Sequence, residues 1–292
     1  MSIDILASGV ADGVLLFLIA SGLTLIFGVL RILNFAHGGF FMLGAYLVYQ
    51  VLGGRATDGA TFLVIAAGAG LAVAAVGIAS EATVFRRLYT LRPVNSLLGT
   101  FALLLVLEGL GQLGWGLSPR SQAVPSSFSA LMRFGGGQVP AYDLVLFAVG
   151  AMVAVGLQLL VNHTPYGRRV RAVAEDRYTA SLLGININAV FVPMFALGIF
   201  LAGLGGALAA PTLGLTPDIA IIFIIEAFAV VIIGGLGSIP GSLVAALGLG
   251  LLNSELVHYA PALADFSVYI ALVAVLLVRP QGLLGRIDSD AL

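Results

Sequence analysis

Long hydrophobic runs with little or no charge alternate with short polar segments along the chain. Most of these runs reach the roughly 20 apolar residues that a helix needs to cross a bilayer. We therefore predict an all-α, polytopic integral membrane protein with eight or nine transmembrane helices. The spans 36–53 and 219–235 are short enough to be half-helices. The nine expected spans are 9–30, 36–53, 61–80, 95–117, 141–162, 189–210, 219–235, 241–259 and 265–279.

Two of the hydrophobic segments contain a similar polar, glycine-rich interruption. The first break is expected at 34–39 and holds Asn34, His37, Gly38 and Gly39; the second is expected at 234–241 and holds Gly234, Gly235, Gly237 and Ser238. Broken helices free backbone groups, which a membrane protein tolerates only beside protein or a water-filled cavity. Matching breaks in the two halves of a transporter point to its substrate pathway. The alternative for each break is a tight turn between two spans, and this alternative weighs more for the second.

Two glutamates fall near the middle of predicted spans. Glu108 lies four residues before Gln112, on the same face of a helix, and Glu226 lies in the span before the second break. An ionisable group inside a membrane is a functional candidate by default. Glu108 could instead pair structurally with a neighbouring helix, and Glu226 could lie near the outer interface.

Composition supports a single transmembrane domain over residues 1–292. Hydrophobic residues make up 60% of the chain and charged residues 9%, and the mean hydropathy is +1.11, whereas soluble domains carry charge on about a quarter of their residues. The chain has no cysteine and no lysine. These absences exclude thiolate metal sites, a lysine Schiff base and a Walker A nucleotide-binding loop. With a net charge of −1, we expect no nucleic-acid partner, and we expect no metal, cofactor or enzymatic activity.

Arginine placement predicts the orientation. Threading nine spans through a bilayer puts most arginines on one side, and cytoplasmic loops carry such an excess. We therefore predict an external N-terminus, a cytoplasmic C-terminus, an external loop at 118–140 and a cytoplasmic loop at 163–188. The nine arginines on the predicted cytoplasmic side are Arg86, Arg87, Arg92, Arg168, Arg169, Arg171, Arg177, Arg279 and Arg286.

The cytoplasmic loop is expected to contain a docking helix. Residues 168–183 read as one charged helix with an apolar side, in which Arg171 and Glu175 can pair at i, i+4, and Gly184 is placed to end it. A short amphipathic helix of this kind suits a groove on a partner, and its mixed charge disfavours the alternative of a helix lying on lipid. The candidate docking residues are Arg168, Arg169, Arg171, Glu175, Asp176 and Gly184.

Five long motifs in this order resemble the permease subunits of branched-chain amino acid ABC importers, and more closely the shorter of the two permeases that such systems pair. The motifs are GLTLIFGVLRILNFAHGGFFMLGAY at 22–46, RRVRAVAEDRYTASLLGIN at 168–186, FALGIFLAGLGGALAAP at 195–211, AFAVVIIGGLGSIPG at 227–241 and LVRPQGLLG at 277–285. Leu33 stands where the family usually has Ile, and the spacing from Glu175 to Gly184 departs from the family's short cytoplasmic loop.

The resemblance implies a transport subunit of a bacterial inner membrane. Its expected partners are a second permease subunit, two cytoplasmic ATP-binding subunits, an extracytoplasmic solute-binding protein, a small-molecule solute and membrane lipid. The resemblance implies that the solute is a branched-chain or other hydrophobic amino acid. Urea, a short amide or another small organic solute is the alternative within the family, and a self-sufficient secondary transporter or channel is the alternative outside it.

Overall fold

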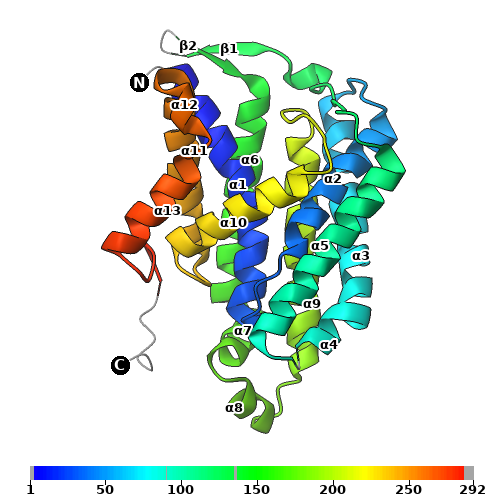
Figure 1. The fold of residues 1–292 in the computed structure, drawn as a ribbon, viewed down its shortest axis with the longest axis vertical. Coiled ribbons are helices and arrows are strands. Elements are labelled where there is room, and N and C mark those ends of the chain that lie inside the picture. The colour runs from blue at the N-terminus through cyan, green and yellow to red at the C-terminus, as the bar shows by residue number, and fades with distance from the viewer. Residues whose placement is uncertain (1–2, 90, 135–136, 286–292) are drawn as a thin grey trace.

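Each apolar run of the sequence forms a helix in the computed structural model, which describes residues 3–89, 91–134 and 137–285 (Figure 1). Six helical segments in this part of the chain are long and apolar enough to cross a membrane, and three shorter apolar helices accompany them. The long ones are α1 (Ile3–Leu30), α3 (Gly59–Ser80) continued by a π-helical turn (Glu81–Phe85) and α4 (Arg86–Leu88), α5 (Pro93–Trp115), α6 (Ala141–His163), α9 (Ile187–Ala209) and α11 (Ile239–Tyr259); the short ones are α2 (Ala36–Leu52), α10 (Ile219–Gly234) and α13 (Ser267–Val278).

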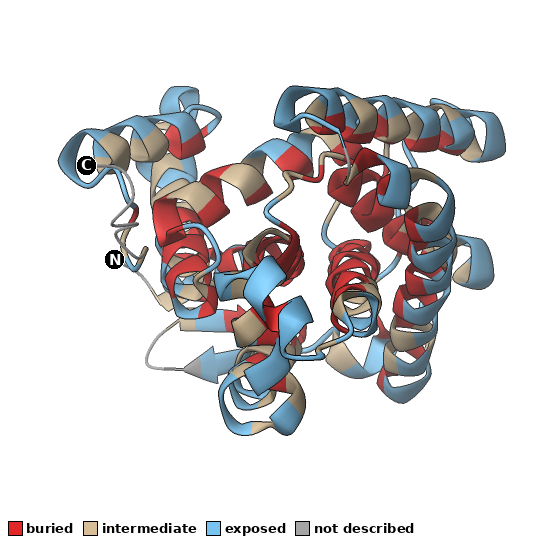
Figure 2. Cartoon of the chain, turned by 90° about the horizontal axis from the view of Figure 1, so that it is seen from below, coloured by how far each residue is buried: buried red, intermediate tan, exposed pale blue. Residues whose placement is uncertain are grey.

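Helix α1 is the centre of the bundle. It is hydrophobic around its whole circumference, as expected of a helix surrounded by protein, and it packs against α6, α9, α10 and α11. Seen along the bundle in Figure 2, buried residues lie at the centre and exposed residues line the outer sides of the peripheral helices. The outward faces of α3, α5 and α6 carry many exposed apolar side chains. Large apolar surfaces of this kind mark contact with a membrane or another protein.

Glycines allow the central helices to approach closely. A Cβ atom added to Gly13 would lie 2.8 Å from the Cα of Leu247 on α11, and one added to Gly9 would lie 2.9 Å from the Cα of Leu251. Between α2 and α9, a Cβ on Gly44 would overlap the backbone of Gly203. Small residues at helix contacts are the usual means by which membrane helices pack backbone to backbone.

The segment between α5 and α6 contains strands that the sequence did not predict. A short 3₁₀ helix (Ser126–Phe128) precedes an antiparallel hairpin of β1 (Leu131–Phe134) and β2 (Gly137–Pro140). Asp4 at the start of α1 accepts a hydrogen bond from the Gln138 backbone at 2.5 Å. In the described residues, the regular structure is helical apart from this hairpin and one isolated bridge between Arg120 and Leu215. The hairpin is fastened to the N-terminal end of α1.

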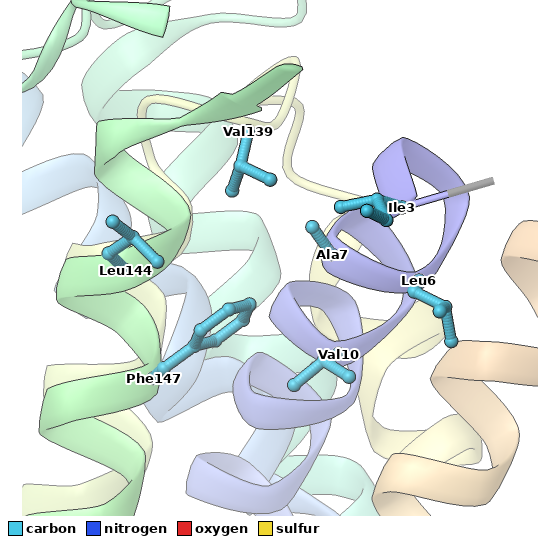
Figure 3. A pocket seen from close by; sticks show the side chains of 7 residues that line it. All are labelled: Ile3, Leu6, Ala7, Val10, Val139, Leu144 and Phe147. Atoms are coloured by element: carbon cyan, nitrogen blue, oxygen red, sulfur yellow. The ribbon is translucent and has the colours of Figure 1, made fainter. Parts of the chain in front are cut away.

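An apolar groove of about 350 Å³ lies beside this hairpin, between α1 and α6 (Figure 3). Among the described residues, only apolar side chains line it. Its lining residues are Ile3, Leu6, Ala7, Val10, Val139, Leu144 and Phe147.

Candidate functional site

The first break lies between α1 and α2 and spans residues 31–35, slightly earlier than the sequence suggested. Asn34 is non-helical, whereas His37, Gly38 and Gly39 form the first turn of α2. Arg31, which follows the last residue of α1, has a φ of 54°. A positive φ is uncommon for a residue with a side chain, and here the chain turns back toward the middle of the bundle.

Helix α2 begins about halfway along α1. The His37 Nε2 atom lies 3.0 Å from the carbonyl oxygen of Ile19. Ile19 is 11 residues before the end of α1 at Leu30, which corresponds to about 16 Å of helix at 1.5 Å per residue. Figure 1 shows the same arrangement, with the connection rising from the lower end of α1 to the start of α2. The polar residues of the first break thus enter the interior of the bundle.

The polar side chains at this break are buried and partly unpaired. Asn34 and His37 are both fully buried, and neither Asn34 amide atom nor the His37 Nδ1 atom has a hydrogen-bond partner in the described structure. The Ile19 carbonyl can only accept a hydrogen bond, so His37 Nε2 carries a proton and donates it. An unpaired buried polar group costs about 1–3 kcal/mol, and such groups are candidates for binding a ligand or water.

Neighbouring helices hold the first break in place. Thr100 on α5 accepts a hydrogen bond from the Phe35 backbone N–H at 3.2 Å, and its hydroxyl lies 3.2 Å from the Leu33 carbonyl. The Phe35 ring packs on Phe228 of α10 with ring centroids 4.7 Å apart. Sequence reasoning missed Thr100, although a polar residue in an apolar span was a signal for it.

The second break is a tight turn between α10 and α11, covering residues 235–238. Gly235 and Gly237 have φ angles of 100° and 82°, which suit glycine. Ser238 caps α11, because its hydroxyl accepts a hydrogen bond from the Gly241 N–H at 3.2 Å. No buried side-chain polar atom of this turn is without a partner in the described structure. The geometry is that of a locally satisfied turn.

The segment after α13 covers this turn. The backbone N–H groups of Leu283 and Leu284 donate to the carbonyls of Ile233 and Gly234, at 2.7 and 3.0 Å. These are carbonyls at the end of α10 that the helix itself leaves unpaired. The motif at 277–285 therefore supports the motif at 227–241. Arg286 lies outside the described residues.

Helix α10 connects the two breaks. A Cβ atom on Gly38 would lie 2.8 Å from the Ile224 Cβ and would overlap the Ala220 carbonyl, so the start of α2 packs directly on the first turns of α10. At the other end of α10, Gly237 lies close to Gly28 of α1. The structure thus places both breaks around α1 and α10, with no direct contact recorded between Asn34 or His37 and the second break.

The two carboxylates lie in different places. Glu108 accepts a hydrogen bond from Gln112 at 3.2 Å on α5, as the spacing indicated, and its second oxygen has no partner among the described residues. Glu226 is half-buried on α10. Neither has a recorded contact with Asn34 or His37.

The predicted docking helix is two helices, which corrects the expectation of a single one. Helix α7 (Pro165–Glu175) ends just before Asp176, and α8 (Arg177–Leu182) begins just after it. Asp176 has an extended backbone and caps α8 by accepting hydrogen bonds from the backbone of Tyr178 and Thr179. The Thr179 hydroxyl and these backbone bonds lower the pKa of the Asp176 carboxyl. An aspartate that caps a helix competes with continuation of the preceding one. Gly184, with a φ of 81°, follows the end of α8 as expected.

The expected pair between Arg171 and Glu175 does not form within 4 Å in the described structure. Arg171 instead donates to the carbonyl of Val161 at the end of α6. Arg168, Arg169 and Glu175 are exposed. They remain available to a partner, while Val170 and Val173 on the other side of α7 are buried against the bundle.

Two arginines with a structural connection to the first break were not among the predicted site residues. Arg177 on α8 donates to the carbonyls of Val29 and Leu30 at the end of α1, and Arg31 donates to the carbonyl of Ala174 on α7. No spacing rule links residues almost 150 positions apart, so the sequence alone could not have paired them.

Comparison with known protein families identifies the family of this chain. The family described as branched-chain amino acid transport system / permease component matches residues 5–278. The chain belongs to this family. The match runs from α1 to the end of α13 and thus includes both breaks and the docking segment, by which we mean α7 and α8.

Relatives in the family cover nearly the whole chain. The chain is 30% identical to the high-affinity branched-chain amino acid transport system permease protein LivH of Salmonella typhimurium, over 97% of this chain and 95% of that protein. It is 30% identical to the corresponding BraD of Pseudomonas aeruginosa, over 98% and 96%. The ribose import permease RbsC of Haemophilus influenzae is 27% identical over 63% and 58%. No solved structure matches the chain. The relatives are transport permeases and not enzymes, and this chain is a multi-pass membrane protein.

Proposed function

We propose that this chain is the membrane subunit through which an ABC importer moves branched-chain or other hydrophobic amino acids across the inner membrane. The observation that carries the proposal is the family match over the whole chain, with relatives whose names specify branched-chain amino acid transport. The buried, unpaired polar groups at the first break support a solute pathway there.

The start of α2 is the proposed point of contact with the solute. The N-terminus of a helix carries a partial positive charge, which suits a carboxylate, although at α2 the N–H groups of His37 and Gly38 already donate to the carbonyls of Asn34 and Phe35 at 3.3 Å. Carbonyls in the non-helical stretch 31–35 suit an ammonium group. Asn34, His37, Gly38 and Gly39 would line this part of the route, and Asn34 can both donate and accept hydrogen bonds. Gly234, Gly235, Gly237 and Ser238 would then form a hinge-like turn at the other end of α10.

The transport cycle in this proposal is alternating access driven by partners. A solute-binding protein delivers the solute from outside, and two ATP-binding subunits act on the docking segment from the cytoplasm. A second permease subunit completes the membrane pathway. The present chain supplies the solute pathway and the docking segment that responds to the ATP-binding subunits. It does not hydrolyse ATP itself in this proposal, because without lysine it has no Walker A loop.

The identity of the solute has a second candidate within the family. The similarity to a ribose import permease over 63% of the chain shows that related scaffolds serve proteins named for other small solutes. Urea, a short amide or another small organic compound is therefore the alternative solute class. A secondary transporter or channel would need no ATP-binding partner.

Reconstitution tests the proposal. The chain would be placed in liposomes with the partner permease, the ATP-binding subunits and the binding protein encoded beside its gene. We expect leucine uptake that requires ATP and the binding protein, and no uptake by the chain alone. Uptake by the lone chain would identify a secondary transporter or channel. ATP-dependent uptake of ribose, urea or an amide but not of leucine would reassign the solute.

A further inference from the structure

Arg177 links the docking segment to the lower end of α1. Its guanidinium donates to the carbonyl of Val29 at 3.0 Å and also to that of Leu30. The same group lies over the Phe191 ring of α9, 4.7 Å from its centroid. Arg177 is half-buried. One side chain thus connects α8 to two helices of the bundle.

Arg31 makes the reverse connection. It is the first residue after α1, and its guanidinium donates to the carbonyl of Ala174 near the end of α7 at 3.3 Å. Each of the two segments therefore sends an arginine to carbonyls at the end of the other. The two cations are close enough that Arg31, after burial, lowers the pKa of Arg177 from its ordinary value. No ion pair of Arg31 or Arg177 with a carboxylate is recorded in the described structure.

The chemistry of helix ends favours hydrogen bonds from the two guanidinium groups to these carbonyls over hydration of the same groups by water. The last carbonyls of a helix have no partner within the helix, and the helix dipole attracts a cation to that end. A guanidinium stays charged, and one of its nitrogens, Nη2, carries two N–H groups and donates to both carbonyls. Hydrogen bonds with a charged donor are roughly twice as strong as neutral ones. The contact with Phe191 adds a cation–π interaction.

The position of these contacts gives them a functional consequence. Val29 and Leu30 are the last residues of α1, and Arg31 begins the first break. A displacement of α8 that keeps both hydrogen bonds must move the end of α1 and the start of the break with it. Buried Val170 and Val173 on α7 also pack on the bundle, but apolar contacts can slide, whereas the arginine contacts fix the relative position of the two elements.

We infer that the reciprocal arginine contacts, Arg177 on the end of α1 and Arg31 on the end of α7, transmit movement of the docking segment to the first break. The inference rests on the proposed function, because it requires that ATP-binding subunits act on α7 and α8. Arg177 and Arg31 are positioning residues in this account. They touch neither the solute nor the nucleotide.

The test measures coupling in the reconstituted complex. Uptake and ATP hydrolysis would be measured together for wild type, Arg177→Ala, Arg177→Lys and Arg31→Ala. We expect Arg177→Ala to lower the solute moved per ATP hydrolysed by about tenfold, a typical size for lost coupling, while assembly and hydrolysis persist. Arg177→Lys should lose less, because an ammonium keeps the charge and can still donate to the helix-end carbonyls but lacks the planar guanidinium that lies over the Phe191 ring. Arg92→Ala, which removes an exposed arginine from the segment between α4 and α5, is the matched control and should couple normally.

A second readout does not depend on the solute. Hydrogen exchange of residues 31–35 would be followed before and after nucleotide binding by the ATP-binding subunits. We expect exchange in this segment to respond in wild type and in Arg92→Ala, and to lose its response in Arg177→Ala.

The outcomes separate the two proposals. Normal coupling in Arg177→Ala or an unchanged exchange response would each overturn the role of the arginines. If Arg177→Ala does not assemble, Arg31→Ala decides the question, because it removes the reverse contact to Ala174, and full coupling in that variant would overturn the inference. Wild-type complex without any ATP-dependent uptake would instead overturn the proposed function.

Discussion

At the scale of single residues, the burial of the Asn34 side chain is the hardest feature to explain by the stability of the fold. Its side chain is fully buried at the first break, and both of its polar atoms lack partners in the described structure. Leaving such groups unpaired costs about 1–3 kcal/mol, more than a typical hydrogen bond contributes. A leucine of similar size would avoid that cost. The presence of asparagine therefore favours a role in transport over a role in folding.

Substituting Asn34 separates these two roles. We expect Asn34→Leu to leave the thermal stability of the purified subunit unchanged or slightly higher, because an apolar side chain replaces an unsatisfied amide. Uptake in the reconstituted complex should fall by about tenfold or more, since one lost hydrogen bond to a substrate group is worth 1.4 kcal/mol or more. Thermal unfolding and uptake assays would measure the two effects.

The control for this experiment is Ser21→Ala. Ser21 is also fully buried, but its hydroxyl donates to the Leu18 carbonyl within α1 at 2.9 Å. It should keep normal uptake. A loss of stability in Asn34→Leu that matches the loss of uptake would mean that the amide is structural.

At the scale of elements, the sequence predicted the helices well because the membrane imposes a strong pattern. All nine expected spans coincide with helices of similar bounds, including the short α2 and α10. The number that cross the membrane stays a prediction. The hairpin of β1 and β2 was missed because the segment rich in Ser, Pro and Gly carries no clear alternation. The docking helix was expected to be continuous because its apolar positions keep a helical period across Asp176, whereas the capping preference of that residue divides it.

The candidate site was predictable only in part, because the sequence pattern reveals unusual residues within a span but not the contacts between spans. Asn34 and His37 stood out as polar residues among apolar ones, and the structure places both inside the bundle. The link from Arg177 to Val29, or from Thr100 to Phe35, depends on which helices become neighbours. Hydrophobic patterning predicts that a helix forms but not which helix it packs against.

Because the docking segment is divided into two helices, α8 can present exposed apolar side chains that a single continuous helix would not suggest. Tyr178 and Leu182 on α8 and Leu183 just after it are 73%, 69% and 76% exposed, although α8 lies beyond the ends of the membrane-length helices in Figure 1. Exposed large apolar side chains mark contact with a membrane or another protein, and the mixed charge of the docking segment disfavours contact with lipid. We expect these side chains to anchor an ATP-binding subunit.

Charge introduced at this point should weaken assembly. Leu182→Asp with Leu183→Asp should reduce co-purification of the ATP-binding subunits by about tenfold or more, the effect of removing an interface anchor. Leu91→Asp is the matched control, because Leu91 is an exposed leucine in the segment between α4 and α5. The amount of permease in the membrane should stay the same in all variants. Undiminished co-purification with the double variant would place the docking surface elsewhere.

At the scale of the whole molecule, the structure separates the two ends of the bundle by charge. Helices α4, α7 and α8 lie at one end in Figure 1, and the hairpin of β1 and β2 lies at the other. These three helices carry six arginines, Arg86, Arg87, Arg168, Arg169, Arg171 and Arg177. Under the positive-inside rule, this is the cytoplasmic end. The hairpin and the start of α1 would then face outward, where a solute-binding protein can reach them.

The absence of cysteine makes this orientation directly measurable, because a single introduced thiol is the only site for a maleimide. Ala130 precedes the hairpin and Ser181 lies on α8, and both are exposed. We expect Ala130→Cys to react with a membrane-impermeant maleimide in intact spheroplasts, and Ser181→Cys to react only after the membrane is opened. The unmodified protein gives the background, and Phe41→Cys, at a fully buried position, should stay unlabelled in both states. The reverse pattern would put α7 and α8 outside the cell, where no ATP is supplied, and the docking segment could not then be the element on which the ATP-binding subunits act.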